Sequence, residues 1–568
     1  MRYFALATDY DGTLAIHGQV DVPTLNALQR YRQSGRRLIM VTGRELPDLK
    51  NVFPELELFD LVVAENGALL YNPATREERS LSEPPPEPFL ERLRASAVPF
   101  SVGRAIIATR EPHHTVVLEV VKELGLELQV IFNKGAVMVL PSGVNKCTGL
   151  TVALNELSLS AHNVVGVGDA ENDHAFLAGC ELAVAVENAL PMLKERADLV
   201  TKGARGAGVI ELIDQILEDD LERYDTTLTR HRILIGQGED RRDFFLTPQR
   251  GSVLFAGPSG SGKSTAATGV FERVAQQGYQ FLLIDPEGDY ETFPGALCLG
   301  STDRAPNPSE VLKSLENPHQ SIVVNLLGIP LEDRPLFFAG LLPRLQEMRT
   351  HTARPHWLIV DEAHHLLPAN WEPAAAMLPQ TLRGMMLITV HPDHVAPAVL
   401  DAVTTVVAVG RGAEKTIRGF VEIAGIESPD VTKSNLEAGE ALVFYRGQQT
   451  THVVKTKPGH IDRKRHLRKY AEGALPPDRS FYFRGPDGKL NLRAQNLLLF
   501  AQLADGVDDQ TWEHHLRRGE YSQWFREMIK DPSLADEVQS VERDGTISAA
   551  ESRKQIRSII ERRYTVAA

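Results

Sequence analysis

Residues 3–13 read YFALATDYDGT and place two aspartates, Asp9 and Asp11, directly after a short apolar run. A run of this length and composition is typical of a buried strand in a parallel sheet. Loops at the carboxyl ends of such strands line the crevice in which ligands bind. Because side chains two residues apart in an extended chain point the same way, we expect both carboxylates to face one ligand.

The pattern that begins here continues to residue 218. Further apolar runs, most of them followed by a helical stretch, read RLIMVTG, LVVAENG, NVVGVGD and LAVAV. This alternation predicts βαβ units and an α/β fold with a Rossmann-like parallel sheet. Residues 80–141, which open near the breaker run EPPPEP, interrupt the rhythm, and we interpret them as a small α/β insert.

A second series of apolar runs follows the charged segment 217–232. It reads SVLFAG, FLLIDP, SIVVNLLG, WLIVDE, MMLITVH, TTVVAVG and EALVFYR, which predicts a second doubly wound sheet. From residue 458 the pattern becomes basic and helical. We therefore expect three parts: residues 1–218 with the insert at about 80–141, residues 230–457, and a basic linker with a small helical domain over 458–568.

Composition indicates a soluble cytoplasmic protein. The formal net charge of −14 disfavours a surface coated with nucleic acid, although it leaves room for a local basic stripe such as HIDRKRHLRKY (460–470). The three cysteines, Cys147, Cys180 and Cys298, give no disulfide framework and no zinc-type spacing. The amino terminus does not read as a signal peptide, and no apolar run reaches the roughly 18 residues that cross a bilayer.

The chemistry favoured by the first part is attack on a phosphate ester. A carboxylate such as Asp9 is repelled by a phosphate dianion, so a divalent cation and fixed donors are needed beside it. Thr42 ends the strand LIMVT, and Lys146 offers a positive charge in GVNKCTGL. Asp169 and Asp173, in GVGDAENDHAF, provide the oxygen ligands that Mg²⁺ prefers.

These four motifs, in this order, resemble the haloacid dehalogenase-like phosphatases: DxDGT, a strand ending in Thr, a Lys, and GDxxND. The position of the insert resembles the IIB subgroup, whose caps are α/β. The resemblance implies that Asp9 is the nucleophile, that Asp11 is the general acid and base, and that Thr42 and Lys146 hold the phosphoryl group. It implies an Mg²⁺ site formed by Asp9, Asp11 (through its carbonyl) and Asp169, with Asp173 supporting either the metal or Lys146. It implies substrate contacts from Gly43, Arg44, Asn133, Lys134 and Asn172.

The substrate implied is a small phosphate ester, either a sugar phosphate or a phosphoglycolate-like compound. The pair Asn133–Lys134 fits a plain β-turn equally well. Cys147 departs from the resembling family, which often has Gly after the Lys, and this departure leaves the chemistry intact.

The second part contains a nucleotide-binding motif. GPSGSGKS (257–264) lies between a predicted strand and a predicted helix and matches G-x-x-x-x-G-K-[ST], in which backbone N–H groups, Lys263 and Ser264 hold phosphates and Mg²⁺. In WLIVDEAHH, Asp361 fits indirect support of that Mg²⁺ and Glu362 fits activation of the attacking water. The predicted ATP-binding residues are Gly257, Pro258, Ser259, Gly260, Ser261, Gly262, Lys263, Ser264, Thr265 and Asp361.

Residues 230–470 resemble the HerA/FtsK-type P-loop ATPases, through LLIDPEGDY, LITVHPDHV and LEAGEALVFYRG as well as the motifs above. The resemblance implies a RecA-like domain and a hexamer in which Arg383 or Arg411 reaches a neighbour's nucleotide. Two differences from the pattern of these ATPases argue against processive DNA translocation. Val390 occupies the position of a polar sensor, and the amino-terminal β-barrel is missing or reduced to RILIGQGEDRRDFFLTP.

The sequence thus favours an Mg²⁺-dependent phosphatase that acts on a small phosphorylated substrate and is controlled by an appended ATPase. The alternative is an ATP-driven nucleic-acid motor or defence-type assembly with an accessory phosphatase. A third hypothesis is a scaffold that binds ATP without turnover. Glu362 argues against it, because a site that only binds ATP does not require a residue that activates water.

In the last part of the chain, we expect the aromatic residues to pack a helical core rather than stack on bases. They are Phe481, Tyr482, Phe483, Trp512, Trp524 and Phe525.

Overall fold

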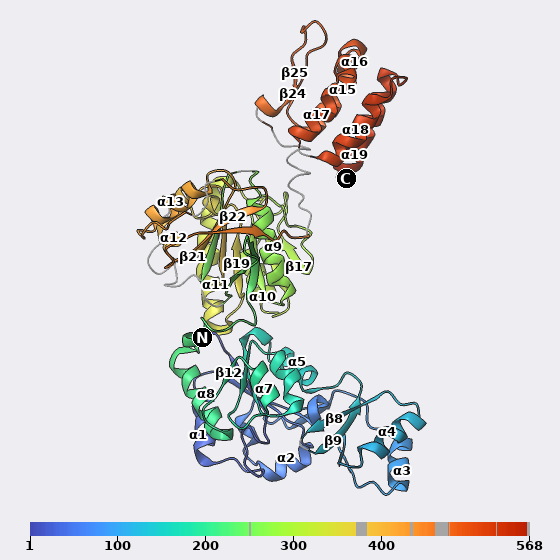
Figure 1. The fold of residues 1–568 in the computed structure, drawn as a ribbon, viewed down its shortest axis with the longest axis vertical. Helices are drawn as coiled ribbons and strands as arrows, with labels where there is room; N and C mark the ends of the chain where they lie inside the picture. The colour runs from blue at the N-terminus through green and yellow to red at the C-terminus, as the bar shows by residue number, and fades with distance from the viewer. Residues whose placement is uncertain are drawn as a thin grey trace. The chain divides into compact units, whose positions relative to one another are not determined.

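The computed structural model describes most of the chain, namely residues 1–133, 135–248, 251–258, 260–370, 383–431, 435–460, 475, 477–529 and 531–564. The chain packs as two compact units. Residues 1–286 and 294–460 form one unit, and residues 287–293 and 461–568 form the other. The larger unit holds two separate α/β sheets, each with its own buried core (Figure 1).

The first sheet has eight strands in the order β12-β11-β10-β1-β2-β3-β4-β5. Its six parallel strands are β1 (Ala5–Thr8), β2 (Arg37–Val41), β3 (Leu61–Ala64), β10 (Val164–Gly168), β11 (Leu182–Ala185) and β12 (Leu199–Val200). The antiparallel strands β4 (Leu69–Asn72) and β5 (Glu77–Ser80) extend one edge. Every residue of β1 and β10 is buried, which fits central strands covered on both faces.

The helices of the first sheet follow the local signals of the sequence. They are α1 (Val22–Gln33), α2 (Leu46–Val52), α5 (Lys146–Glu156), α6 (His174–Ala178), α7 (Pro191–Arg196) and α8 (Arg205–Asp219). Asp21 caps α1 by accepting a hydrogen bond from the Thr24 backbone N–H, at 2.9 Å. Thr24, Ala27, Leu28 and Tyr31 then recur at helical spacing and form its buried face.

The insert is an α/β unit, as the sequence indicates. Strands β6 (Ser101–Val102), β7 (Ile107–Arg110), β8 (Leu128–Asn133) and β9 (Ala136–Pro141) form an antiparallel sheet in the order β6-β7-β9-β8. Helices α3 (Glu87–Ala95) and α4 (His114–Glu123) pack on it around a small core that includes Phe89 and Val117. We call this unit the cap (Figure 1).

The second sheet has eleven strands in the order β14-β13-β23-β22-β21-β15-β20-β19-β16-β18-β17. The parallel strands are β15 (Ser252–Ala256), β16 (Phe281–Asp285), β17 (Ala296–Leu299), β18 (Ser321–Asn325), β19 (Trp357–Val360), β20 (Met385–Thr389) and β21 (Val403–Val409). Its longer helices are α9 (Lys263–Gln276), α10 (Pro308–Leu315), α11 (Arg334–Thr352) and α13 (Ala413–Ile423).

The remaining four strands of the second sheet are antiparallel: β13 (Ile233–Gly238), β14 (Asp243–Leu246), β22 (Glu440–Tyr445) and β23 (His452–Thr456). The segment RILIGQGEDRRDFFLTP therefore forms a hairpin at one edge of this sheet.

The smaller unit contains a hairpin of β24 (Phe481–Phe483) and β25 (Leu492–Ala494) followed by helices. These are α15 (Leu497–Gly506), α16 (Asp509–Arg517), α17 (Glu520–Glu527), α18 (Pro532–Arg543) and α19 (Ala549–Tyr564). The helical prediction for residues 481–483 is thus wrong, since these residues pair as a strand. The core-packing prediction holds for the buried rings of Phe481, Phe483, Trp512, Trp524 and Phe525.

Two further predictions concern membrane-spanning segments and the basic stretch that begins at His460. Within those residues, no helix combines the length and the apolar character that crossing a membrane requires. The basic stretch after His460 lies outside the described residues.

Candidate functional site

The carboxyl ends of β1, β2 and β10 carry the residues that the sequence singled out. Asp9 directly follows β1, Thr42 follows β2 and Asp169 follows β10. Because these strands are parallel neighbours, their carboxyl ends meet at one edge of the sheet. All three residues are buried.

Lys146 joins the same edge from the first turn of α5, where Asn145 caps the helix. Its Nζ donates to Asp9 Oδ1 and to Asp173 Oδ1, both at 2.6 Å. Asp173 Oδ2 in turn accepts from the backbone N–H groups of Asp169, at 2.8 Å, and Ala170, at 2.9 Å. Asp173 therefore fixes both the lysine and the loop that carries Asp169.

The three buried carboxylates fit a divalent cation. Oxygen atoms of Asp9, Asp169 and Asp173 lie within 4.8 Å of one another. Burial, together with the charge of Asp173, raises the pKa of Asp9 well above its usual range, although Lys146 acts in the opposite direction. A hard cation that prefers oxygen would offset this clustering of negative charge, which is the environment that Mg²⁺ takes in proteins.

Lys146 remains a cation despite its burial. Desolvation lowers the pKa of its ammonium, but the charges of Asp173 and Asp9 outweigh that effect and raise the pKa. A charged lysine against Asp9 can also neutralise a bound phosphoryl oxygen.

Asp11 does not join the acidic cluster. Its carboxylate is 44% exposed and accepts two hydrogen bonds from Arg44, at 2.6 Å from Nε and 2.7 Å from Nη2. Arg44 also pairs with Asp48, and its backbone N–H donates to Thr42 Oγ1 at 3.2 Å. The bidentate Arg44 contact holds the Asp11 side chain beside the cluster, and the expectation that Asp9 and Asp11 face one ligand stays a prediction.

A glycine permits the close approach of the loops after β1 and β10. Gly12 has φ +85°, and a Cβ there would lie 2.3 Å from Asp169 Oδ2. Asn188 bridges the same loops, since its Nδ2 donates to Gly12 O at 2.9 Å and to Asp169 Oδ2 at 3.4 Å. Thr13 Oγ1 adds a contact of 3.4 Å to Asp169 Oδ1.

The cap is anchored beside the acidic cluster by Glu65. This buried carboxylate accepts the backbone N–H groups of Arg104 and Ala105, each at 2.9 Å, and of Ile106, at 3.2 Å. Met138 of the cap reaches the core, because a Cβ on Gly43 would lie 3.3 Å from its sulfur. A side chain of the cap therefore borders the loop that follows β2.

The other residues expected to contact substrate are Asn133, Asn172 and Lys134. Strand β8 packs against the turn 171–173, and the side-chain oxygen of Asn133, at the end of β8, is buried without a hydrogen-bond partner among the described residues. Asn172 Nδ2 donates to Asn66 Oδ1 at 3.0 Å. Lys134 lies outside the described residues.

Several contributing residues were missed by sequence reasoning. Glu65, Asn66 and Asn188 act through contacts with residues far along the chain, and Thr13, the last residue of DYDGT, contacts Asp169. The stretch AENG directly after β3 was a usable signal for Glu65 and Asn66, because polar residues end a buried strand there.

The second sheet brings its own predicted residues together. The loop 257–262 connects β15 to α9, which begins at Lys263. Lys263 Nζ lies 3.8 Å from Glu362 Oε2, and both side chains are buried. The backbone N–H of Glu362 donates to Asp361 Oδ1 at 2.9 Å, directly after β19.

Glycines again allow close packing in this loop. A Cβ on Gly257 would lie 2.4 Å from Val409 O, and Gly262 precedes α9 with φ +90°. Ser264 is half-buried and Thr265 is exposed, whereas Ser259 lies outside the described residues. Of the two candidate arginines, Arg383 pairs with Glu222 at 2.7 Å and Arg411 is exposed.

Comparisons with known proteins match the part of the chain that contains the first site. The family model of the haloacid dehalogenase-like hydrolases matches residues 6–105 and 105–213. The chain is 30% identical over 218 residues to "Phosphoglycolate phosphatase 2" of Saccharolobus solfataricus, covering 37% of this chain and 91% of that protein. It is 31% identical over 222 residues to "Phosphoglycolate phosphatase" of Methanothermobacter thermautotrophicus, covering 38% and 98%.

Solved structures include a haloacid dehalogenase-like hydrolase from Bacteroides thetaiotaomicron. It aligns with a TM-score of 0.34 at 20% identity, covering 38% of this chain and 99% of that one.

Proposed function

Because the chain belongs to the haloacid dehalogenase-like hydrolases through residues 6–213, we propose that its first part is an Mg²⁺-dependent phosphomonoesterase with Asp9 as nucleophile. The observation that carries this proposal is the buried group in which Lys146 bonds both Asp9 and Asp173 while Asp169 lies alongside. Asp9, Asp169 and the Asp11 carbonyl would hold Mg²⁺, and the cation would neutralise charge on the phosphoryl oxygens.

The proposed reaction has two displacements at phosphorus. Asp9 Oδ attacks phosphorus, the ester P–O bond breaks, and the carboxyl group of Asp11 gives its proton to the leaving oxygen. Asp11 then takes a proton from water, which attacks phosphorus and breaks the bond to Asp9. Inorganic phosphate leaves and both aspartates return to their starting states. Thr42 and Lys146 hold the phosphoryl group during both steps.

Arg44 has two partners in this proposal. Arg44 holds Asp11 by a bidentate contact, and an anionic substrate would take over part of that contact. A substrate that carries a carboxylate near its phosphate would offer Arg44 a matching planar anion. Phosphoglycolate has this chemistry, and the similarity to two phosphoglycolate phosphatases supports it over a neutral sugar phosphate.

For the second part, we propose that residues 257–264 bind Mg²⁺–ATP, with Lys263 on the phosphates and Glu362 activating water. The support is the loop between β15 and α9 and the 3.8 Å approach of Glu362 to Lys263. Coupling to the phosphatase is supported by the segment that follows α9. There, Gln277 O and the Tyr279 hydroxyl bond to His162 and Glu181 of the first sheet.

A phosphate-release screen of the full chain tests both proposals. Phosphoglycolate, several sugar phosphates and nucleotides would be offered with and without ATP, using wild type, Asp9→Asn and Lys263→Ala. We expect phosphoglycolate to be the best substrate, Asp9→Asn to be inactive on it, and ATP to change the wild-type rate but not that of Lys263→Ala. If Asp9→Asn releases phosphate as fast as wild type, the phosphatase proposal fails.

The same screen with added DNA tests the alternative of a nucleic-acid motor. ATP hydrolysis that depends on Lys263 and rises several-fold with DNA would favour the motor. An ATPase rate that is unchanged by DNA favours the regulatory role.

A further inference from the structure

A second cluster of metal-ligand side chains lies at the opposite edge of the first sheet from Asp9. His162 occupies the short turn Ala161–Asn163 before β10, and Glu181 directly precedes β11, so both lie at the amino ends of adjacent parallel strands. The backbone N–H of Glu181 donates to Ala161 O at 3.0 Å, which fixes the two positions. His231 comes from the segment just before β13.

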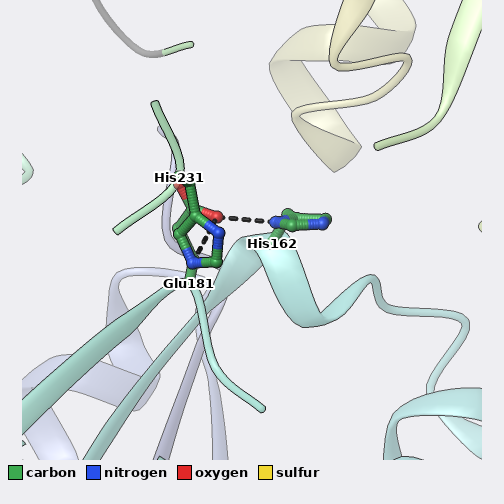
Figure 2. Close-up of side chains that lie close together, drawn as sticks. All are labelled: His162, Glu181 and His231. Atoms are coloured by element: carbon green, nitrogen blue, oxygen red, sulfur yellow. Dashed lines mark hydrogen bonds and ion pairs between the residues drawn. The ribbon is translucent and has the colours of Figure 1, made fainter. Parts of the chain in front are cut away.

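The three side chains converge on one point. Figure 2 shows the Glu181 carboxylate with dashed lines to one nitrogen of each imidazole ring. Glu181 Oε2 lies 2.6 Å from His162 Nδ1 and 3.6 Å from His231 Nε2, and the three ligand atoms all lie within 4.8 Å of one another. A tetrahedral zinc ion with bonds of about 2.0–2.1 Å separates its ligand atoms by about 3.3 Å, which falls between the two measured distances.

The two ring nitrogens of His162 have different hydrogen-bond partners. His162 Nε2 lies 2.9 Å from Gln277 O. A carbonyl oxygen can only accept, so Nε2 carries the hydrogen and, in the neutral ring, Nδ1 presents a lone pair to Glu181. Two electron pairs 2.6 Å apart repel each other, so either a proton or a metal ion must lie between Nδ1 and the carboxylate. A metal-ligating histidine whose other nitrogen donates to a backbone carbonyl has this arrangement.

His231 gives an independent indication. Its Nε2 is buried and has no hydrogen-bond partner among the described residues, although it points toward Glu181 Oε2. A buried ring nitrogen without a partner is costly unless a ligand satisfies it. Glu181 and His231 also line a small cavity of about 20 Å³, a volume sufficient for one water molecule.

We propose that His162 Nδ1, Glu181 Oε2 and His231 Nε2 bind a divalent transition-metal ion, of which Zn²⁺ best fits two imidazoles and one carboxylate. The ion would lie at the contact between the two sheets of the larger unit. The Tyr279 hydroxyl donates to both oxygens of Glu181 at 3.1 Å, and its ring stacks on His162 with centroids 3.7 Å apart. Both Gln277 and Tyr279 follow α9, the helix that begins at Lys263.

Metal content of the full-length chain, purified without a histidine tag, tests this proposal. After chelation and dialysis against one equivalent of Zn²⁺ in excess Mg²⁺, we expect one zinc per chain in wild type. Asp169→Asn, which alters the other acidic cluster, should retain it. His231→Ala and Glu181→Gln should lose it, and Tyr279→Phe should bind roughly 10–100-fold more weakly. His319→Ala serves as the matched control, because His319 is an exposed histidine that contacts Asn155 of the first sheet at 2.6 Å.

A spectroscopic measurement on wild type keeps the proposal falsifiable if the variants misfold. Zinc-edge X-ray absorption should show nitrogen and oxygen ligands at about 2.0–2.1 Å with imidazole scattering and no sulfur. Wild type that holds no zinc under these conditions, or variants that hold as much zinc as wild type, would overturn the proposal. That result would leave His162–Glu181 as an ordinary hydrogen-bonded pair and would not bear on the phosphatase proposal.

Discussion

At the scale of single residues, the first site depends on Lys146 as the counter-charge of two buried carboxylates. Lys146→Met leaves Asp9 and Asp173 buried without that partner. We expect it to lower the free energy of unfolding of the first transition in urea by roughly 3–5 kcal/mol. Lys50→Met is the matched control, since Lys50 pairs with Glu78 at the surface and should cost under about 1 kcal/mol. Equal effects of the two variants would contradict the assigned role of Lys146.

Gly12 offers a second test at this scale. Gly12→Ala places a methyl group 2.3 Å from Asp169 Oδ2 and at φ +85°, so the loop or the aspartate must move. We expect phosphatase kcat to fall on the order of 100-fold, because displacements of about 1 Å in a catalytic group have effects of that size.

Gly35→Ala is the matched control, because it introduces backbone strain at a positive φ without displacing a neighbouring group. Gly35 has φ +86°, but no atom lies within 4 Å of the position that its new methyl group would take, and it lies in the turn between α1 and β2. This variant should lose roughly 1–2 kcal/mol of stability and keep its kcat. If Gly12→Ala behaves in the same way, the close approach to Asp169 has no catalytic consequence.

At the scale of elements, the docking of the cap depends on three backbone hydrogen bonds to Glu65. Glu65→Gln replaces one acceptor oxygen by an amide that faces backbone N–H groups. We expect hydrogen exchange at the amides of residues 104–106 to accelerate roughly 10–100-fold, and KM to rise more than kcat falls. Glu77→Gln, an exposed change on β5, should leave both unchanged. Unaltered exchange at 104–106 in Glu65→Gln would show that other contacts hold the cap.

The elements that sequence could predict are those with a continuous apolar run. The central strands β1, β2, β3, β10 and β11 were all visible in this way, and Asp9, Thr42 and Asp169 were located by the ends of those strands. Strand β5 was missed because all four of its residues are exposed, which leaves no hydrophobic pattern to detect. The strand at Phe481–Phe483 was misread because three apolar residues have no period.

Side-chain pairings across the fold could not be predicted. The contact of Arg44 with Asp11 spans 33 residues, and that of Glu65 with Ala105 spans 40. His162, Glu181 and His231 lie at no recognised ligand spacing, so only the parallel pairing of β10 and β11 brings the first two together. Tertiary geometry, rather than local pattern, determines these contacts.

At the scale of the larger unit, the two sheets are joined by specific polar contacts. Besides His162 and Glu181, Arg354 Nη2 donates to Ser158 O at 3.2 Å, and Arg383 pairs with Glu222. Binding of ATP at Lys263 is expected to stabilise the unit by mass action, by about 2.7 kcal/mol at one hundred times the dissociation constant. A thermal melt with ATP and Mg²⁺ should show a higher Tm for wild type and no change for Lys263→Ala.

Lys313→Ala is the control for this melt, because Lys313 is an exposed residue of α10. Its Tm should rise with ATP and Mg²⁺ as that of wild type does. An equal rise in Tm for Lys263→Ala would show that ATP does not bind through the loop 257–264.

In the proposed reaction, Asp9 becomes phosphorylated during turnover. Asp11→Asn should slow the second displacement, so that the covalent intermediate accumulates when the reaction with phosphoglycolate is quenched in acid. Peptide mass spectrometry of the quenched full chain is the most direct measurement. We expect one added phosphoryl group on the peptide that contains Asp9, and none in Asp9→Asn. A phosphoryl group on another residue, or phosphate release by Asp9→Asn at the wild-type rate, would contradict it.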